Sequence, residues 1–426
     1  MRGAGIAAVV AMASLAACQG VSHDRIDEWR ETEKGPSKLK AALGNADLDP
    51  DLRAHAAQNL VQISEYAYVR TALEGMPDAQ RGPIVGKLVP RLQADAQSPE
   101  GTAPSQRSVL AKDALVDLRP LVDVATRERI DAFLADWMGS NYIDRSGRGR
   151  YRGEQIVRLV GARIAPKLLA EARRLIAAAP DAQGRIPIVP DELLKALALS
   201  GDPEAVDLLL DLARKDHPEP TLRRRAMAAL YVAYVGDPAE PKPSPAGIKP
   251  HVRTLAALVR DPDQPGANVN DAFAVLAAAG EPECVDPLLD LVRSPEKAEA
   301  FLWVAVHKAL LCVGADGVAQ VVEAMPTDRG YERGILEKYL WNKMLSLEPK
   351  AAVAEGCRAM LSSASWVARA TGVECLGRAG SRADADAVAA LAGDRTPLRG
   401  WAGGGAKGAI SLGSVAQQVA NKLKNM

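Results

Sequence analysis

The amino-acid sequence predicts an all-α protein, a right-handed α-solenoid in which about nine or ten helix pairs stack on one another. Two observations lead to this fold class. Aromatic residues make up only 4% of the chain, and Ala and Leu dominate its apolar residues, a composition that favours close-packed helices over sheets. Amphipathic segments with helical spacing also recur along the chain at nearly constant intervals, which indicates a repeat array.

The start of the chain has the features of an export signal. Arg2 gives a short positive region, and the apolar run that follows it is too short to span a bilayer as a stable helix. Residues 15–18, Leu-Ala-Ala-Cys, then resemble the lipobox of bacterial lipoproteins. The resemblance implies that residues 1–17 are removed as a signal peptide and that Cys18 carries a lipid. The alternative is an ordinary secretory peptide with a chance cysteine.

Lipidation of Cys18 would place the protein on a membrane surface. Buried acyl chains contribute about 0.8 kcal/mol per CH₂, so they anchor a protein without a transmembrane helix. Gln19 follows the cysteine where the Gram-negative pattern for inner-membrane retention has Asp, so the resemblance implies the outer membrane and a periplasmic location. Residues 18–37 are polar and contain Gly and Pro, and we expect a tether between the lipid and the fold.

The next region, residues 38–180, is expected to form degenerate helical repeats. The repeat pattern is weaker here, and residues 49–63 and 151–176 resemble degenerate members of it. A polar linker at 93–107 and a basic loop at 140–153 interrupt them.

The basic loop is the most unusual local feature of the sequence. Arg145, Arg148, Arg150 and Arg152 lie close together among glycines, although the chain as a whole is neutral. Arginine binds carboxylates and phosphates through paired hydrogen bonds, so these four residues are candidates for binding an anionic partner. The interpretation that we favour over this one is a solvated loop whose arginines pair with neighbouring acids.

The clearest repeats occupy residues 181–426. Similar amphipathic segments begin at Gly201, Gly247, Gly280, Gly314, Glu348 and Gly380. From Gly247 onward the intervals are 32 to 34 residues, and the Pro-rich insertion 236–250 explains the longer interval before it. Each segment follows another helix, and the glycine between them suits a helix C′ position, where a positive φ is needed. The preceding helices are expected at 221–236, 268–280, 298–314 and 365–380.

These units resemble HEAT repeats, specifically the short bacterial kind of phycobilisome-lyase-type (PBS-lyase-type) repeats. The resemblance rests on the pattern of Arg224, Arg225, Ala226, Ala229 and Leu230, and of Gly201, Asp202, Pro203, Ala205, Val206 and Leu209. The two halves of the pattern come from adjacent units here, which is a departure from the family. The resemblance implies an α-solenoid, and armadillo-type or other α-solenoid repeats are the alternative.

Four cysteines lie inside the helical patterns: Cys284, Cys312, Cys357 and Cys375. None has a metal-ligand spacing, and we expect them to be free cysteines that act as small apolar residues of the core. A disulfide between Cys284 and Cys312, on neighbouring helices, is the alternative that an oxidising compartment would permit.

Three tryptophans, Trp303, Trp341 and Trp366, recur on the first helices of successive units. If they share an exposed groove they are candidate anchors for a partner, because Trp is favoured at the centre of interfaces. Tryptophans at such spacing more often belong to the core between units, and this is the interpretation that we favour.

Function is inferred from architecture and elimination. Lys plus Arg and Asp plus Glu number 53 each, so nothing in the overall charge favours a nucleic-acid partner. The five histidines are scattered, without HExxH or a His-Glu dipeptide, which argues against zincin chemistry and against the HEAT-fold di-iron hydroxylases. We therefore expect no catalytic residues, no metal, and no cofactor besides the lipid on Cys18. The leading interpretation is a non-enzymatic envelope lipoprotein that binds a protein partner as a scaffold or adaptor. The alternative is an enzyme-like or accessory, lyase-type HEAT protein acting on an envelope component.

Overall fold

The computed structural model describes residues 20–97, 102–178, 188–214, 216, 219–293, 299–401 and 410–426. Within these residues the protein is helical, and the one pairing of strand type is an isolated bridge between Pro397 and Ser411. The prediction of an all-α, solenoid-like fold is confirmed. The chain divides into two compact units, unit 1 over Met1–Ala196 and unit 2 over Leu197–Met426, and each is described by itself.

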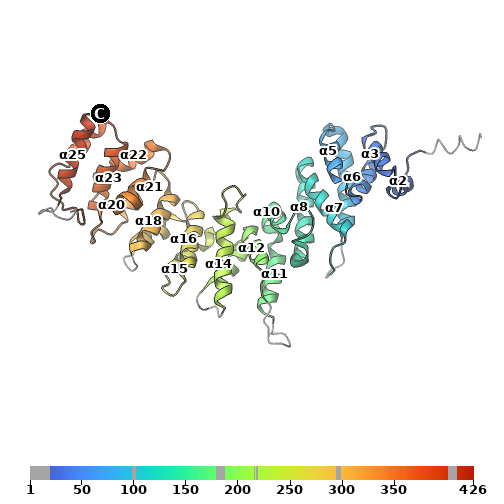
Figure 1. The fold of residues 1–426 in the computed structure, drawn as a ribbon, viewed down its shortest axis with the longest axis horizontal. Helices are drawn as coiled ribbons and strands as arrows, with labels where there is room; N and C mark the ends of the chain where they lie inside the picture. Colours follow the sequence, from blue (N-terminus) through green and yellow to red (C-terminus); the bar gives the residue numbers. More distant parts are fainter. Residues whose placement is uncertain are drawn as a thin grey trace, which may run out of the picture. The chain divides into compact units, whose positions relative to one another are not determined.

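In unit 1, successive helices pack side by side (Figure 1). Its α-helices are α2 (His23–Arg30), α3 (Gly35–Gly44), α4 (Pro50–Gln62), α5 (Tyr66–Glu74), α6 (Asp78–Ala96), α7 (Gln106–Leu118), α8 (Val124–Gly139), α9 (Tyr142–Arg145), α10 (Gly153–Val160) and α11 (Ala165–Ile176), and α12 (Asp191–Ser200) crosses the boundary to unit 2. Helix α4 packs on α3 and α6, α6 packs on α7, and α10 packs on α8. Apolar faces are therefore covered by the next helix of the stack, as a repeat fold requires.

The polar tether expected over 18–37 is shorter than predicted, because helix α2 forms within it. Ser22 caps the helix by accepting a hydrogen bond from the Arg25 amide, and the Ile26 side chain is fully buried. Arg30 donates a 2.7 Å hydrogen bond to the side chain of Gln62 on α4. One buried isoleucine in a polar segment was too weak a pattern to predict this helix.

Two interruptions in unit 1 are also narrower than expected. Helix α6 continues to Ala96 and α7 begins at Gln106, so both ends of the predicted linker 93–107 are helical. The first half of the basic loop 140–153 contains the short helix α9. The segment 151–176, which was expected to be a degenerate repeat, consists of α10 and α11, and Gly161 adopts φ +60° between them.

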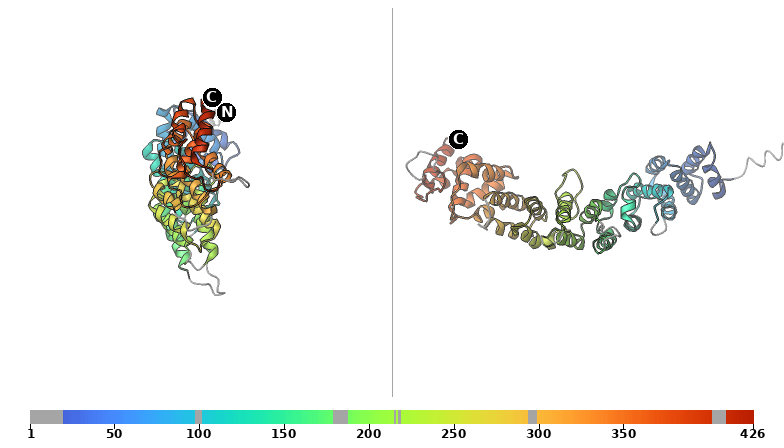
Figure 2. Two further views of the ribbon diagram at one scale, coloured as in Figure 1. Left: turned by 90° about the vertical axis from the view of Figure 1, so that its left-hand side faces the viewer. Right: turned by 60° about the horizontal axis from the view of Figure 1, so that its bottom comes forward.

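Unit 2 is a stack of helix pairs, which Figure 2 shows from two further sides. Its α-helices are α13 (Pro203–Ala213), α14 (Pro220–Tyr234), α15 (Val252–Arg260), α16 (Gly266–Ala278), α17 (Val285–Arg293), α18 (Glu299–Val313), α19 (Val318–Glu323), α20 (Arg333–Leu336), α21 (Asn342–Met344), α22 (Lys350–Met360), α23 (Trp366–Ala379), α24 (Ala385–Ala389) and α25 (Leu412–Lys424). A π-helical turn, η6 (Glu337–Trp341), joins α20 to α21. Within the stack, α14 contacts α16, α16 contacts α18, and α18 contacts η6, so these elements form one layer.

The glycine turns of unit 2 follow the sequence prediction. Gly201, Gly280 and Gly314 have φ values of +66°, +73° and +61°, and each lies just after a helix. At the Gly201 turn, Asp202 caps α13 by accepting hydrogen bonds from the two amides that follow Pro203. Two predicted turns differ. Gly247 lies in the short 3-10 helix η4 (Pro245–Gly247) without a positive φ, and Gly380 is extended with φ −77° and ψ 179°.

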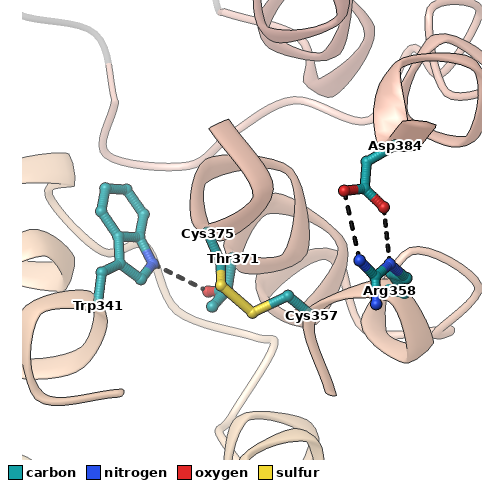
Figure 3. Close-up of a disulfide and its surroundings, with 6 residues drawn as sticks. All are labelled: Trp341, Cys357, Arg358, Thr371, Cys375 and Asp384. Atoms are coloured by element: carbon teal, nitrogen blue, oxygen red, sulfur yellow. Dashed lines mark hydrogen bonds and ion pairs between the residues drawn. A yellow bond between two sulfur atoms is a disulfide. The ribbon is translucent and has the colours of Figure 1, made fainter. Parts of the chain in front are cut away.

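The four cysteines of unit 2 are paired, so the expectation of free thiols is wrong. Cys284 is joined to Cys312, the bond that was weighed as the alternative, and Cys357 is joined to Cys375. The Cα atoms of the two pairs are 6.2 and 6.1 Å apart, which is a separation that a disulfide spans. Figure 3 shows the second disulfide linking α22 to α23. Packing of adjacent helices brings the partners together, which helical periodicity alone does not reveal.

Candidate functional site

The arginines of the basic loop are largely engaged within unit 1. Arg145 is 2% exposed, donates hydrogen bonds to the Trp137 carbonyl and the Ser140 hydroxyl, and lies over the Trp137 ring. Arg150 forms an ion pair with Asp117. These two guanidinium groups are therefore held by groups of the protein itself.

A buried lysine explains why the loop is ordered. Lys112 is fully buried, and its ammonium group donates hydrogen bonds of 3.1 and 2.7 Å to the carbonyls of Arg148 and Tyr151 while pairing with Asp113. The Asp113 carboxylate also accepts hydrogen bonds from the amides of Arg150 and Tyr151. A buried charge is stabilised only when it is paired and hydrogen-bonded, so the loop wraps this pair.

The remaining two arginines, Arg148 and Arg152, are exposed. Arg152 and the paired Arg150 line a cavity of about 900 Å³ beside the loop, together with Glu154 and Glu192. Charges of both signs line this cavity, so it offers no clear preference for an anion. The basic loop thus leaves few unengaged cationic groups for a partner.

All three candidate tryptophans are buried in the core of unit 2, as the core interpretation predicts. Trp341 is fully buried, and its indole N–H donates a 3.2 Å hydrogen bond to the Thr371 hydroxyl (Figure 3). Trp366 is 7% exposed and donates a 3.0 Å hydrogen bond to the carbonyl of Thr327. Both indole groups therefore satisfy their polar atom inside unit 2, as buried tryptophans usually do.

Trp303 is also buried, at 6% exposed, but the accessible part of its side chain lines the cavity that forms our candidate site. This cavity has a volume of about 810 Å³, lies on the layer of α14, α16, α18 and η6, and is called the α18 cavity below. The Trp303 ring is stacked on Tyr339 at 5.8 Å between centroids and with 20° between the planes. The α18 cavity is lined by Tyr231 of α14, by Asn270, Asp271 and Ala274 of α16, by Trp303, Val304, His307 and Lys308 of α18, and by Ile335, Tyr339 and Lys343 of the segment α20–η6–α21.

Helical spacing explains how these side chains come to share one surface. On α18, Trp303 and His307 are four residues apart, and so are Val304 and Lys308. Side chains at positions i and i+4 lie on the same face of a helix. The segment from α20 to α21 adds Ile335, Tyr339 and Lys343 at the same spacing, and Tyr339 lies in the π-helical turn. Such turns frequently occur at functional sites.

The α18 cavity combines an aromatic wall with unneutralised positive charge. Tyr231, Trp303 and Tyr339 form the aromatic part. Within the described residues, the ammonium groups of Lys308 and Lys343 form no ion pair or hydrogen bond. Burial lowers the pKa of Lys308, so this side chain is partly desolvated as well as unpaired.

The other titratable groups of the cavity do not neutralise the lysines. The carboxylate of Asp271 is already paired with Arg224. Burial lowers the pKa of His307, and the positive charges of Lys343 and Lys308 lower it further. The cavity is therefore suited to an anionic group that lies next to an apolar or aromatic one.

Sequence reasoning identified Trp303 but missed its neighbours. Tyr231, His307, Lys308, Tyr339 and Lys343 come from three different helical segments, and only the stacking of those segments brings them together. A usable signal was present in α18, where aromatic, basic and apolar residues repeat at four-residue spacing on a single helix.

Cys18 lies outside the residues that the structure describes, so its lipidation stays a prediction. Across the described residues, no helix has both the length and the apolar character needed to cross a membrane. The same part of the chain contains no cluster of three or more His, Cys, Asp or Glu side chains arranged to hold a metal ion.

No family model and no curated protein matches this chain. Among solved structures, an engineered protein from a structural genomics consortium is 13% identical, with 95% of this chain and 93% of that chain covered and a TM-score of 0.25. Human deoxyhypusine hydroxylase in complex with glycerol is 15% identical, with 81% and 100% covered and a TM-score of 0.22. TM-scores this low carry no argument about function, and the resemblance to HEAT repeats stays a prediction.

Proposed function

We propose that this chain is an exported, lipid-anchored binding protein of the cell envelope, which holds a protein partner in the α18 cavity. The α18 cavity is the observation that carries this proposal. It combines an aromatic wall, two lysines without counter-ions in the described part of the chain, and side chains from successive helices of a repeat stack. Repeat stacks bind partners through such extended surfaces.

Export and anchoring are supported by two separate features. The lipobox-like sequence at 15–18 supports lipidation of Cys18 and, with Gln19 after it, a place on the periplasmic side of the outer membrane. The pairing of Cys284 with Cys312 and of Cys357 with Cys375 supports an oxidising compartment, where disulfides form and persist. Both features agree with a mature protein outside the cytoplasm.

A scaffold role explains the site better than catalysis does. The cavity contains one histidine, His307, and one carboxylate, that of Asp271, which is already paired with Arg224. General acid–base catalysis needs a proton-transfer group placed to reach a substrate, often oriented by another group. The side chains of the α18 cavity instead suit recognition, since they offer aromatic contact area and cationic groups that can pair with charges of opposite sign on a partner.

The proposal is tested by purifying the full-length tagged chain from native membranes after mild crosslinking. We expect Cys18→Ala to remove the protein from the membrane fraction and to abolish palmitate labelling. We expect the charge-reversed pair Lys308→Glu with Lys343→Glu to lose a specific protein that the wild type retains. Arg382→Glu with Arg395→Glu is the matched control, because it makes the same charge change at two exposed arginines of unit 2 outside the cavity.

Each part can fail separately. Palmitate incorporated into the Cys18→Ala variant as well as the wild type would end the anchor proposal. The same proteins recovered with both charge-reversed pairs and the wild type would show that the α18 cavity is not the binding site.

A further inference from the structure

The α18 cavity also constrains the chemistry of its occupant. Lys308 and Lys343 come from different helical segments, and neither has a carboxylate partner within the residues that the structure describes. Lys308 is only partly exposed, so its charge is poorly compensated by water. A partly desolvated charge gains more from a bound counter-ion than a fully exposed one does. The occupant should therefore carry at least two negative charges.

The aromatic wall requires an apolar group beside those charges. Trp303 and Tyr339 are stacked on each other, and Tyr231, across α16 from them, is 36% exposed. Trp303 is 6% exposed, so the more accessible Tyr231 and Tyr339 provide most of the contact area for another aromatic or a large aliphatic group. The volume of about 810 Å³ is ample for such a side chain and the backbone on either side of it.

The polar part of the lining favours a peptide over a lipid chain. Asn270 is exposed at the cavity, and its amide can donate to and accept from a peptide backbone. An acyl chain in the same place would cover Asn270, Asp271 and His307 without offering them hydrogen bonds, which costs free energy. The cavity also extends over helices of successive pairs, which suits an extended segment.

We propose that the α18 cavity binds an acidic peptide segment of the partner, with carboxylates on Lys308 and Lys343 and a large apolar side chain between Tyr231, Trp303 and Tyr339. This inference rests on the proposed function and specifies the partner's chemistry. It makes two separable claims, one about charge and one about the apolar group. Each can be tested with its own change in the peptide and its own change in the protein.

The test uses the full-length Cys18→Ala chain and a fluorescently labelled peptide of glutamates around a central phenylalanine. Binding is measured by fluorescence anisotropy. We expect binding that weakens with added salt and that falls about tenfold or more in Lys308→Glu with Lys343→Glu. The neutral pair Lys308→Gln with Lys343→Gln should give an intermediate loss. Arg382→Glu with Arg395→Glu should bind within about twofold of the wild type, since exposed charges remote from a site contribute little.

The apolar claim is tested by Tyr231→Ser, which changes an exposed side chain and spares the core. This variant should weaken the phenylalanine peptide several-fold and leave the weaker binding of its alanine version nearly unchanged, because only the first peptide has a ring to contact Tyr231. Circular dichroism shows whether each variant is folded. If Lys308→Glu with Lys343→Glu does not fold, Lys308→Gln with Lys343→Gln replaces it in the test of the charge claim.

Three results would overturn the inference. The glutamate peptide could bind no tighter than its glutamine version, the charge-reversed pair could bind as the wild type does, or oleate could occupy the cavity and exclude the peptide. None of these would by itself remove the proposed function, because a partner recovered from membranes through the α18 cavity could carry a segment of other chemistry. Conversely, peptide binding without any cavity-dependent partner in the membrane would leave this inference standing and refute the proposed function.

Discussion

Reduction of the disulfides should destabilise unit 2 by an amount set by the length of chain that each one closes. Cys357 and Cys375 are separated by 18 residues, and Cys284 and Cys312 by 28. In the chain-entropy model, closing loops of these lengths stabilises the folded state by about 3 kcal/mol and about 3.6 kcal/mol, respectively, at 25 °C. Domains are commonly stable by only about 5–15 kcal/mol, so losing both disulfides should remove much of the stability of unit 2.

The assay compares urea unfolding of the full-length Cys18→Ala chain with and without a phosphine reductant, followed by circular dichroism. This background leaves only the four cysteines of unit 2. Reduction preserves all four sulfur atoms in the core, whereas Cys357→Ala with Cys375→Ala also creates a small cavity. With the reductant present in both samples, the alanine pair should therefore be slightly less stable than the wild type. A midpoint that does not move on reduction would refute the loop argument. Alkylation of all four thiols in the denatured, unreduced protein would refute the disulfides themselves.

Further predictions concern the core, the basic loop and the response to pH. Leu209 is fully buried, so Leu209→Ala should lower the free energy of unfolding by about 2–5 kcal/mol in urea titrations, and an unchanged midpoint would show that this face of α13 is not packed. Arg150→Glu would place a carboxylate beside Asp117 and should lower the melting temperature, whereas Arg148→Glu should shift stability by no more than about 0.5 kcal/mol; equal effects would contradict the described ion pair. Burial lowers the pKa of His55 despite its contact with an aspartate. As the pH is lowered, His55 is therefore protonated in the unfolded chain at a higher pH than in the folded chain. The free energy of unfolding should then fall as the pH drops below the ordinary histidine pKa of about 6.5. A His55→Gln variant with the same pH dependence would exclude this residue as the cause.

The fold could be predicted where the signal is local in the sequence. Gly201, Gly280 and Gly314 end their helices with positive φ as expected, since a glycine at C′ acts through its own backbone. Helix α2 was missed because its burial depends on α4, and the cysteine pairs were missed because helix packing determines them.

The candidate site could be predicted only in part, because it also depends on how the helices pack on one another. Trp303, Trp341 and Trp366 have similar positions in the repeat, yet only Trp303 lines the α18 cavity. All three indoles are buried, and the difference comes from neighbouring elements, since a π-helical turn brings Tyr339 against Trp303 at the edge of the cavity. In the basic loop, the number of arginines suggested a binding surface. The buried Lys112 that organises the loop lies on another helix, α7, and carries no sequence signal of its own.

The central claim is that the α18 cavity holds the partner, and site-specific photo-crosslinking in living cells tests it most directly. A benzoylphenylalanine at position 231 replaces Tyr231, which lines the cavity, and the control places it at Leu311, which is 53% exposed on α18 outside the cavity. We predict one discrete adduct from position 231, absent when Lys308 and Lys343 are reversed, whose crosslinked peptide is acidic and contains a large apolar residue. The same adducts from positions 231 and 311, or an adduct from 231 that survives charge reversal, would contradict the account.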